Sequence, residues 1–418
     1  MRLLHEHAGN IEARLGSGID VRRVVVQDLQ RERGPHVDRS LLTTDADALL
    51  DDPEIDIVVE VMGGVERAEQ FVRRALGAGK AVVTANKALL ATSGQSLFEL
   101  AEQKGVDLYF EAAVAGGVPV IRVLREALTS DQVKSLRGIV NGTSNYILSR
   151  MQEQEHLDFA EALREAQEQG FAEADPTLDV GGGDAAHKLT ILANLAFGTR
   201  ISLDQVPMEG IDQVSALDML FAKRFGFAIK PLAVVQRMED NSLDVRVHPA
   251  LVDRKRVLSS VRGALNAVYI EGAALGPCML SGLGAGALPT AVSVVSDIVD
   301  VGRNLLTQSS GRVKPHAPNG SDAPEPRVRS LSEHQCRFYL RFSVQDQSGV
   351  LGELAGILGE HQVSIEQMVQ DGHGQAEPVS VVVLTHPAIE GNVRAALARI
   401  DALPSIVAPT RALRIEEE

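Results

Sequence analysis

The chain contains no tryptophan, and aromatic residues make up only 4% of its 418 positions. This scarcity argues against recognition that depends mainly on stacking aromatic side chains on bases or sugars. No apolar run reaches the roughly 20 residues needed to cross a bilayer, and the N-terminus lacks the apolar core of a signal peptide. Two cysteines, Cys278 and Cys336, are too few for a disulfide framework and favour a cytoplasmic location.

Basic residues are also in the minority. Lys and Arg total 41 against 56 Asp and Glu, giving a formal net charge of −15, whereas a surface for nucleic acid would need clustered positive charge. Apolar residues (44%) and charged residues (23%) occur at ordinary globular frequencies, which excludes wholesale disorder. At about 150 residues per domain, the length predicts two or three domains.

In the first 128 residues, short β-branched runs alternate with amphipathic segments. The runs predict strands at residues 21–26, 55–61, 81–84 and 106–111, and the segments predict helices at residues 66–78 and 93–104. Such an alternation is typical of βαβ units on a parallel sheet. Residues 1–15 predict a helix, so the alternation starts on a helix with no strand before it.

The rest of the chain predicts three further parts. Residues 129–286 mix helical segments with strand-like runs, which favours an α+β domain with an open sheet. A helix at residues 287–305 begins with an apolar, small-residue face suited to packing on the first domain. Residues 307–336 are rich in Pro, Gly and charge and predict a linker. Residues 337–418 follow a βαββαβ order, which is typical of a ferredoxin-like module.

The densest group of chemically active side chains lies at residues 170–188. Three carboxylates occupy a stretch too rich in Gly and Pro to predict a helix: Glu173, Asp175 and Asp179. After three glycines a helix is expected to begin at Asp184, which shares a helical face with Lys188 four residues on. Alone, such a pair is more often an N-cap and a solvated ion pair. A lysine held among carboxylates at a helix start also suits proton transfer to a carbonyl oxygen.

Three motifs stand at the ends of predicted strands or in Gly-rich turns. Thr84 and Lys87 directly follow a strand, where parallel sheets place ligands, although a single exposed lysine is common. Gly63 ends another strand beside a second glycine, which suits either a plain turn or the close approach of a nucleotide. Glu111 opens a Gly-rich turn whose carboxylate and carbonyl oxygens suit a hard cation, or a tight turn before a helix.

Two other motifs are ambiguous from the sequence. The NGTSN sequence at residues 141–145 suits helix capping or substrate contact. The SGLGAG sequence at residues 281–286 is a weak match to a dinucleotide-binding loop. The histidines show no metal-ligand spacing, so zinc is not expected.

Taken in order, six motifs resemble homoserine dehydrogenase. They are VVEVMGG, VVTANKALLA, EAAVAGGVPVI, GIVNGTSNYIL, the stretch from FAEADPTLDV to GGGDAAHKL, and GLGAGALPT, and they cover nearly all of residues 1–305. The DQSGVL sequence at residues 346–351 is similar to that of an ACT domain, a common regulatory attachment in this family. The resemblance implies an α/β protein: a Rossmann-like NAD(P)-binding domain at residues 1–128, completed by the helix at 287–305, then a substrate-binding and dimerisation domain at 129–286 and a ferredoxin-like ACT domain.

The resemblance also implies NAD(P)-linked interconversion of L-homoserine and L-aspartate 4-semialdehyde, on the route to threonine, methionine and isoleucine. Lys188 matches the family's proton donor and acceptor, and Glu173 and Asp184 match carboxylates that bind the substrate. Lys87 matches a lysine near both cofactor and substrate. The other implied contacts are Gly63, Thr84 and Gly284 for the cofactor, and Glu111 with the carbonyl groups of Val114, Gly116 and Val118 for a sodium-like monovalent cation.

The start of the chain departs from the family pattern. The family opens with a strand and a Gly-x-Gly-x-x-Gly turn, whose amides hold the pyrophosphate at the first helix. This chain begins at the helix, so we expect the sheet to lack a central strand and the affinity for the cofactor to fall. We also expect the codons upstream of Met1 to encode the missing start. Asp28 lies where this family contacts the ribose of the cofactor, and Arg31 and Arg33 follow it. The sequence therefore does not decide between NADP and NAD.

Three functions are consistent with these observations. The first is the enzyme with amino-acid feedback through residues 337–418. The second is a catalytically impaired, truncated form that acts only as an amino-acid-binding regulatory protein. The third is a dehydrogenase of another amino-acid semialdehyde, which the set of Glu173, Asp184 and Lys188 disfavours. The resemblance further implies a homo-oligomer, expected to be a dimer formed through the open sheet of the middle domain, and threonine as the effector; neither nucleic acid nor a membrane is an expected partner.

Overall fold

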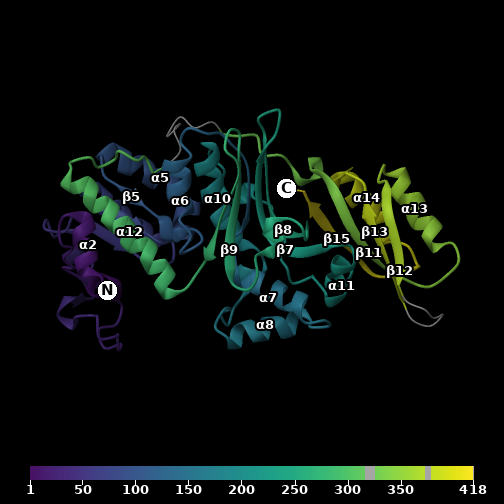
Figure 1. Ribbon diagram of the computed structural model, residues 1–418, viewed down its shortest axis with the longest axis horizontal. Helices are drawn as coiled ribbons and strands as arrows, with labels where there is room; N and C mark the ends of the chain where they lie inside the picture. The colour runs from purple at the N-terminus through teal and green to yellow at the C-terminus, as the bar shows by residue number, and fades with distance from the viewer. Residues whose placement is uncertain (316–324, 372–377, 418) are drawn as a thin grey trace. The chain divides into compact units, whose positions relative to one another are not determined.

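The computed structural model describes residues 1–315, 325–371 and 378–417. The predicted linker at residues 307–336 is therefore described only in part. Two compact units make up the chain, and many of its helices and strands are labelled in Figure 1. The first unit contains residues 1–134, 187–203 and 270–326, and the second contains residues 135–186, 204–269 and 327–418. Within the described ranges, no helix is both long and apolar enough to cross a membrane.

The first unit holds two small parallel sheets. The larger has the order β3 (Ile57–Glu60), β4 (Ala81–Thr84) and β5 (Leu108–Tyr109), and the smaller pairs β1 (Val24–Val25) with β2 (Leu42–Thr43). No strand joins the two sheets in the part of the chain that the structure describes. The strands predicted at residues 21–26 and 106–111 were both too long, because only two residues of each pair with a neighbour.

Helices cover the parallel sheets of the first unit. Those in the N-terminal part are α1 (Arg2–Glu6), α2 (Ala8–Leu15), the single-turn η1 (Arg39–Leu41), α3 (Asp47–Leu50), α4 (Glu66–Gly77) and α5 (Lys87–Lys104). Later in the chain come η2 (Glu111–Ala113), α6 (Val120–Arg122), the π-helical η3 (Val123–Ala127) and α12 (Ala287–Leu306). The single helix predicted at residues 1–15 is two helices that meet at His7.

The apolar periodicity of these helices explains their packing. In α4, Ala68, Val72 and Ala75 recur every three or four residues and face the core that Val82 of β4 also joins. Helix α12 places Ile298 and Val301 in a second small core with residues of β4 and β5. The carboxyl ends of β3 and β4 therefore lie at one edge of a sheet that is covered by helices.

One antiparallel-rich sheet runs through the second unit. Its strands are ordered β9-β6-β7-β8-β15-β11-β13-β12. Their bounds are β6 (Val133–Ile139), β7 (Phe227–Arg237), β8 (Leu243–Asp253), β9 (Leu265–Gly272), β11 (Gln335–Val344), β12 (Ile365–Asp371), β13 (Val379–Thr385) and β15 (Ile406–Glu416), with β14 (Ala388–Ile389) paired to β11. Strand β10 (Gly276–Leu283) includes residues that the sequence assigned to a glycine loop, so that assignment was wrong for residues 281–283.

The helices of this part of the chain lie between these strands in the sequence. They are α7 (Gly142–Glu153), α8 (Phe159–Glu168), α9 (Thr177–Val180), α10 (Gly183–Phe197), η4 (Leu203–Gln205), α11 (Ala216–Arg224), η5 (Val257–Ser260), η7 (Leu331–Glu333), α13 (Val350–Glu360) and α14 (Glu390–Ile400). The prediction that residues 173–179 contain no helix was wrong. Pro176 precedes the single turn of α9, a position where a proline's missing N–H costs no hydrogen bond.

The C-terminal module has the predicted βαββαβ order, with sheet order β15-β11-β13-β12. Its outer strand β15 also pairs in parallel with β8, with Arg414 opposite Ala250 and Glu416 opposite Val252. A shared apolar core contains Leu251 of β8 and Leu413 of β15. The module therefore continues the sheet of the preceding domain within the second unit.

Candidate active site

Glu60 organises the carboxyl ends of β3 and β4 in the first unit. Its side chain is buried, and one carboxylate oxygen accepts hydrogen bonds from the backbone N–H groups of Met62 (2.8 Å) and Gly63 (3.3 Å). The other oxygen accepts a hydrogen bond of 2.6 Å from the Thr84 hydroxyl. Gly63 has φ +74°, a conformation that favours glycine. Two of the predicted cofactor contacts, Gly63 and Thr84, are thus brought together on one carboxylate.

Asn86 connects the same loop to the start of α5. Its side-chain amide donates to the carbonyl of Gly64 (2.7 Å), and its side-chain oxygen accepts from the N–H of Leu89 (3.1 Å) as the helix N-cap. Lys87 is the first residue of α5 and is half-buried. The lysine is therefore held at a fixed place beside the glycine turn.

The turn predicted to bind a cation starts at the buried Glu111. Its carboxylate accepts two hydrogen bonds of 2.8 Å, from the N–H groups of Ile121 and Arg122 at the start of α6. The carbonyl of Gly116 accepts a hydrogen bond of 2.7 Å from the Ser293 hydroxyl. A Cβ at Gly116 would lie 2.5 Å from the carbonyl oxygen of Gly284, so these two glycines are in close contact. The predicted cation and cofactor residues Gly116 and Gly284 are therefore neighbours.

Burial makes this turn an unfavourable place for negative charge. It raises the pKa of Glu111, against the lowering effect of the N–H groups of Arg122 and Ile121. Burial also raises the pKa of Asp297 to about 7, and the charge of Glu111 adds to the increase. Asp297 accepts a 2.8 Å hydrogen bond from the backbone N–H of Glu111. The two acids therefore form a coupled buried pair on η2 and α12.

Asn141 joins two carboxylates of the second unit. It precedes α7, and its side-chain amide donates hydrogen bonds of 2.7 Å to both Asp179 and Asp184. Its side-chain oxygen accepts from the N–H of Ser144 (2.7 Å) as the N-cap of α7, so the capping interpretation of the NGTSN motif is confirmed. Asn145 of the same motif instead donates to three backbone carbonyls at residues 261–265.

Helix α10 carries the predicted catalytic lysine. Asp184 is only 3% exposed and Lys188 only 9%, so the expectation of a solvated ion pair was wrong. The helix begins at Gly183, one residue earlier than expected. Glu173, the second predicted substrate carboxylate, is exposed, and its backbone carbonyl accepts from the side-chain amide of Gln167 (3.1 Å).

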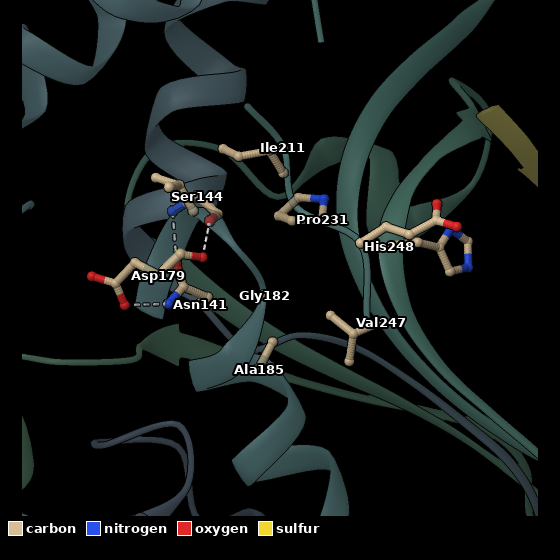
Figure 2. Close-up of a pocket in the computed structure, with 11 residues that line it drawn as sticks. Asn141, Ser144, Asp179, Gly182, Ala185, Ile211, Pro231, Val247 and His248 are labelled. Carbon is tan, nitrogen blue, oxygen red and sulfur yellow. Dashed lines mark hydrogen bonds between the residues drawn. The ribbon is translucent and has the colours of Figure 1, made fainter. Parts of the chain in front are cut away.

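A narrow pocket lies beside the two carboxylates that Asn141 joins. Figure 2 shows Asn141, Ser144 and Asp179 on one side, with Val247 and His248 of β8 on the other. The Ser144 hydroxyl donates to the backbone carbonyl of Asp179 (2.9 Å), which fixes α9 to the start of α7. Further lining residues are Val180, Gly182, Ala185, Glu209, Ile211 and Pro231.

Comparisons with known proteins address the whole chain. Residues 119–299 match the family model described as homoserine dehydrogenase, and residues 1–111 match the homoserine dehydrogenase NAD-binding domain model. Residues 338–404 match the ACT domain model. A homoserine dehydrogenase from Pseudomonas aeruginosa is 41% identical over 419 residues, which cover 99% of this chain and 95% of that protein. The chain belongs to the homoserine dehydrogenase family.

Solved structures of the homoserine dehydrogenase family agree in fold. The structure of a homoserine dehydrogenase from Thiobacillus denitrificans is 41% identical and superposes with a TM-score of 0.91, covering 100% of this chain and 94% of that one. A hyperthermophilic archaeal homoserine dehydrogenase in complex with NADPH is 29% identical, with a TM-score of 0.53, and covers 62% of this chain and 74% of its own. The protein is thus an NAD(P)-dependent oxidoreductase with a C-terminal ACT domain.

The ACT domain of this homoserine dehydrogenase is joined to the catalytic domain by the ion pairs of two buried arginines. Arg414 of β15 is buried and binds Glu390 (2.5 and 2.7 Å) as well as Glu209 (2.8 and 2.9 Å), which also lines the pocket in Figure 2. Burial raises the pKa of Glu209, but the hydrogen bonds and charge of Arg414 outweigh it and lower the value to about 2. A second ion pair between the two domains joins Arg246 of β8 to Glu416 of β15 (2.5 Å).

Sequence reasoning missed the roles of Glu60 and Glu209, and it recognised Asn141 as a helix cap or substrate contact but not as the link between two carboxylates. Glu60, Asn141 and Glu209 each act through partners that are distant in the chain; Asp184, for example, is 43 residues from Asn141. The only local signal for Glu60 was its place as an acidic residue at the end of the apolar strand sequence VVE. No local pattern marks Glu209.

Proposed function

We propose that this member of the homoserine dehydrogenase family interconverts L-homoserine and L-aspartate 4-semialdehyde, with Lys188 as the proton-transfer residue. The observation that carries this proposal is the placement of Lys188 on α10, one turn after the buried Asp184. In oxidation, the lysine would take the proton of the substrate hydroxyl; in reduction, it would return a proton to the carbonyl oxygen. The nicotinamide, when bound, supplies or accepts the hydride.

The substrate would be held by charge at both ends. Asp184 and Glu173 are the proposed carboxylate contacts, and Lys87 at the start of α5 is the proposed cationic one. The proposed role of Asp184 is supported by the burial of its side chain and by its hydrogen bond to Asn141. Glu173 is exposed, so its participation would depend on the substrate itself bringing the two groups together.

The cofactor would lie at the edge where β3 and β4 end. The glycine turn at Gly63 and the hydroxyl of Thr84 fit a nucleotide there, because both are fixed by Glu60 and the turn carries no side chain that blocks close approach. Gly284, in contact with Gly116, is the proposed second backbone contact.

We also propose NADP as the preferred form of the cofactor. The Arg33 guanidinium donates to the backbone carbonyls of Asp28 and Arg31, each at 2.9 Å, and so brings positive charge to the loop after β1. A ribose 2′-phosphate suits that charge. Changing Arg33 to alanine is expected to raise KM for NADP and leave KM for NAD unchanged; equal effects on both would contradict the preference.

A sodium-like cation is proposed at the Glu111 turn. The buried carboxylate of Glu111 and the carbonyl groups of Val114, Gly116 and Val118 supply the oxygen ligands that such a cation prefers. The backbone supports the proposal, since Ala115 and Gly116 both have positive φ, which produces an irregular turn rather than a helix. Thermal unfolding in sodium, potassium and choline chlorides would test it, with selective stabilisation by one alkali ion as the expected result.

The ACT domain is proposed to bind threonine as a feedback effector. The parallel pairing of β15 with β8 and the Arg414–Glu209 contact support transmission of its state to the catalytic domain. We also propose a homodimer, supported by the exposed apolar Leu265 of β9, and a cytoplasmic location, supported by two free thiols. Light scattering would give the oligomeric state, and titration calorimetry of the full chain would test threonine binding.

Turnover assays of the full chain test the central proposal. Formation of NADPH from homoserine and NADP, and its consumption with aspartate semialdehyde, are the expected results. Alanine, which has no hydroxyl group to oxidise, and simple amino alcohols serve as substrate controls. Absence of turnover with homoserine, together with undiminished threonine binding, would favour the purely regulatory alternative.

A further inference from the structure

Asn141 occupies an unusual position between two acids. Both protons of its side-chain amide are donated to carboxylates, one to Asp179 on α9 and one to Asp184 on α10. Asn141 is 4% exposed; its hydrogen bond to Asp184 is buried and its hydrogen bond to Asp179 is partly buried, and carboxylate acceptors strengthen both. A neutral amide therefore lies between two acidic side chains that would otherwise repel each other.

The surrounding backbone leaves Asn141 little freedom. A Cβ on the next residue, Gly142, would lie 2.9 Å from the carbonyl oxygen of Ala264, so the chain passes close to its neighbour there. The side-chain oxygen is fixed by the N–H of Ser144, and Ser144 in turn binds the backbone of Asp179. Three elements, α7, α9 and α10, are thus held together around one amide.

We propose that Asn141 is a positioning residue for homoserine, which holds the side chain of Asp184 correctly oriented one turn before Lys188. The proposal rests on the proposed function of Lys188 and Asp184 and deepens it. It assigns the orientation of the substrate-binding carboxylate of Asp184 to a side chain that need not touch the substrate. The simpler alternative is that Asn141 only caps α7.

Two substitutions separate positioning from capping. Aspartate and serine are as good as asparagine at a helix N-cap, so N141D and N141S both retain that role. N141D has the same shape but places a third carboxylate where the two donors were. N141S adds no charge but is too short to bridge both acids. N145S is the matched control, since Asn145 is a buried neighbour on the same helix that binds only backbone carbonyls in the hydrogen bonds described above.

The first measurement is oxidation of homoserine by the wild-type chain. If the wild type does not oxidise homoserine, the proposed function fails. The variants are then compared only by the shift in melting temperature that homoserine induces. With an active wild type, N141D should raise KM for homoserine and lower kcat/KM by roughly 10- to 100-fold, as expected for lost charge-assisted hydrogen bonds. KM for NADP should not change. The acid limb of its kcat/KM profile should move to higher pH, because one of three adjacent carboxyls keeps a proton.

N141S should raise KM for homoserine without moving the acid limb, and N145S should lower the melting temperature while leaving KM and the pH profile at wild-type values. Wild-type KM and pH profile in N141D would overturn the proposal. A loss in N141D that affects the KM values for homoserine and NADP equally would assign Asn141 to structure alone. If N141D does not fold, N141S decides: an unchanged homoserine KM, or an unchanged homoserine-induced melting shift, overturns the positioning role.

Discussion

Arg414 and Glu209 are joined by two hydrogen bonds, of 2.8 and 2.9 Å, although they are 205 residues apart in the chain. Arg414 belongs to the last strand of the ACT domain, and Glu209 lines the pocket beside Asn141 and Asp179. The guanidinium also binds Glu390, which is 1% exposed. The buried Arg414 and the exposed Arg394 therefore contact the same two acids at the junction of the regulatory and catalytic domains.

Replacing Arg414 with methionine should destabilise the protein strongly. Removing one member of a buried ion pair costs about 3–5 kcal/mol. Because Arg394 still pairs with Glu390 (2.6 Å) and Glu209 (3.1 Å), we expect the lower end of that range. The free energy of unfolding from urea titration measures the effect. Arg399→Met is the control, because Arg399 pairs with Glu360 at an exposed site and its loss should cost about 1 kcal/mol or less. Similar losses in the two variants would contradict the prediction.

The contribution of Glu209 to stability should depend on pH. Its pKa is lowered from 4.5 to about 2 in the folded chain, so its stabilising effect is complete above pH 4.5 and is lost as the pH falls towards 2. Since 39% of its side chain is exposed, we expect only about 1–2 kcal/mol. The free energy of unfolding of wild type and Glu209→Gln should therefore differ near pH 6 and converge at acid pH. A difference that does not change with pH would exclude the linkage.

Changing Lys188 to alanine should remove most turnover. Loss of a general acid–base residue typically lowers the rate by about 10²–10⁴-fold. Binding of homoserine, measured by its effect on melting temperature in the presence of cofactor, should persist. Lys223→Ala provides the control, because Lys223 is an exposed lysine paired with Glu155. Undiminished kcat in the Lys188 variant would remove its proton-transfer role.

Glu60→Gln should weaken cofactor binding. A glutamine side chain has one acceptor oxygen where the carboxylate has two, so the Thr84 hydroxyl and the Met62 and Gly63 N–H groups cannot all be satisfied as before. A loss near 1.4 kcal/mol corresponds to a roughly tenfold higher Kd for NADPH, which fluorescence titration would measure. The exposed Glu54→Gln change is the control. An unchanged Kd would show that the loop holds its shape without the carboxylate.

Local sequence patterns predicted those strands and helices that their own residue types favour without help from distant partners. The β-branched run at β4 was predicted with the residues that the structure assigns to it, because it is a short strand whose four residues are all buried. The strand β10 was missed because its glycines favour turns, and only its pairing with a neighbour makes it a strand. The roles of Glu60 and Asn141 needed the fold, since their partners lie on other elements.

The position of β15 has a consequence for synthesis of the chain. Strand β8 lies between β7 and β15, and residues 406–416 of β15 are made more than 150 residues after β8. During translation, the backbone groups of residues 250–252 of β8, and the buried Arg246 that pairs with Glu416, must therefore wait for these partners until residue 416 has left the ribosome. A nascent catalytic domain would expose an open strand edge throughout that interval, which is the stage at which a chaperone would bind most usefully.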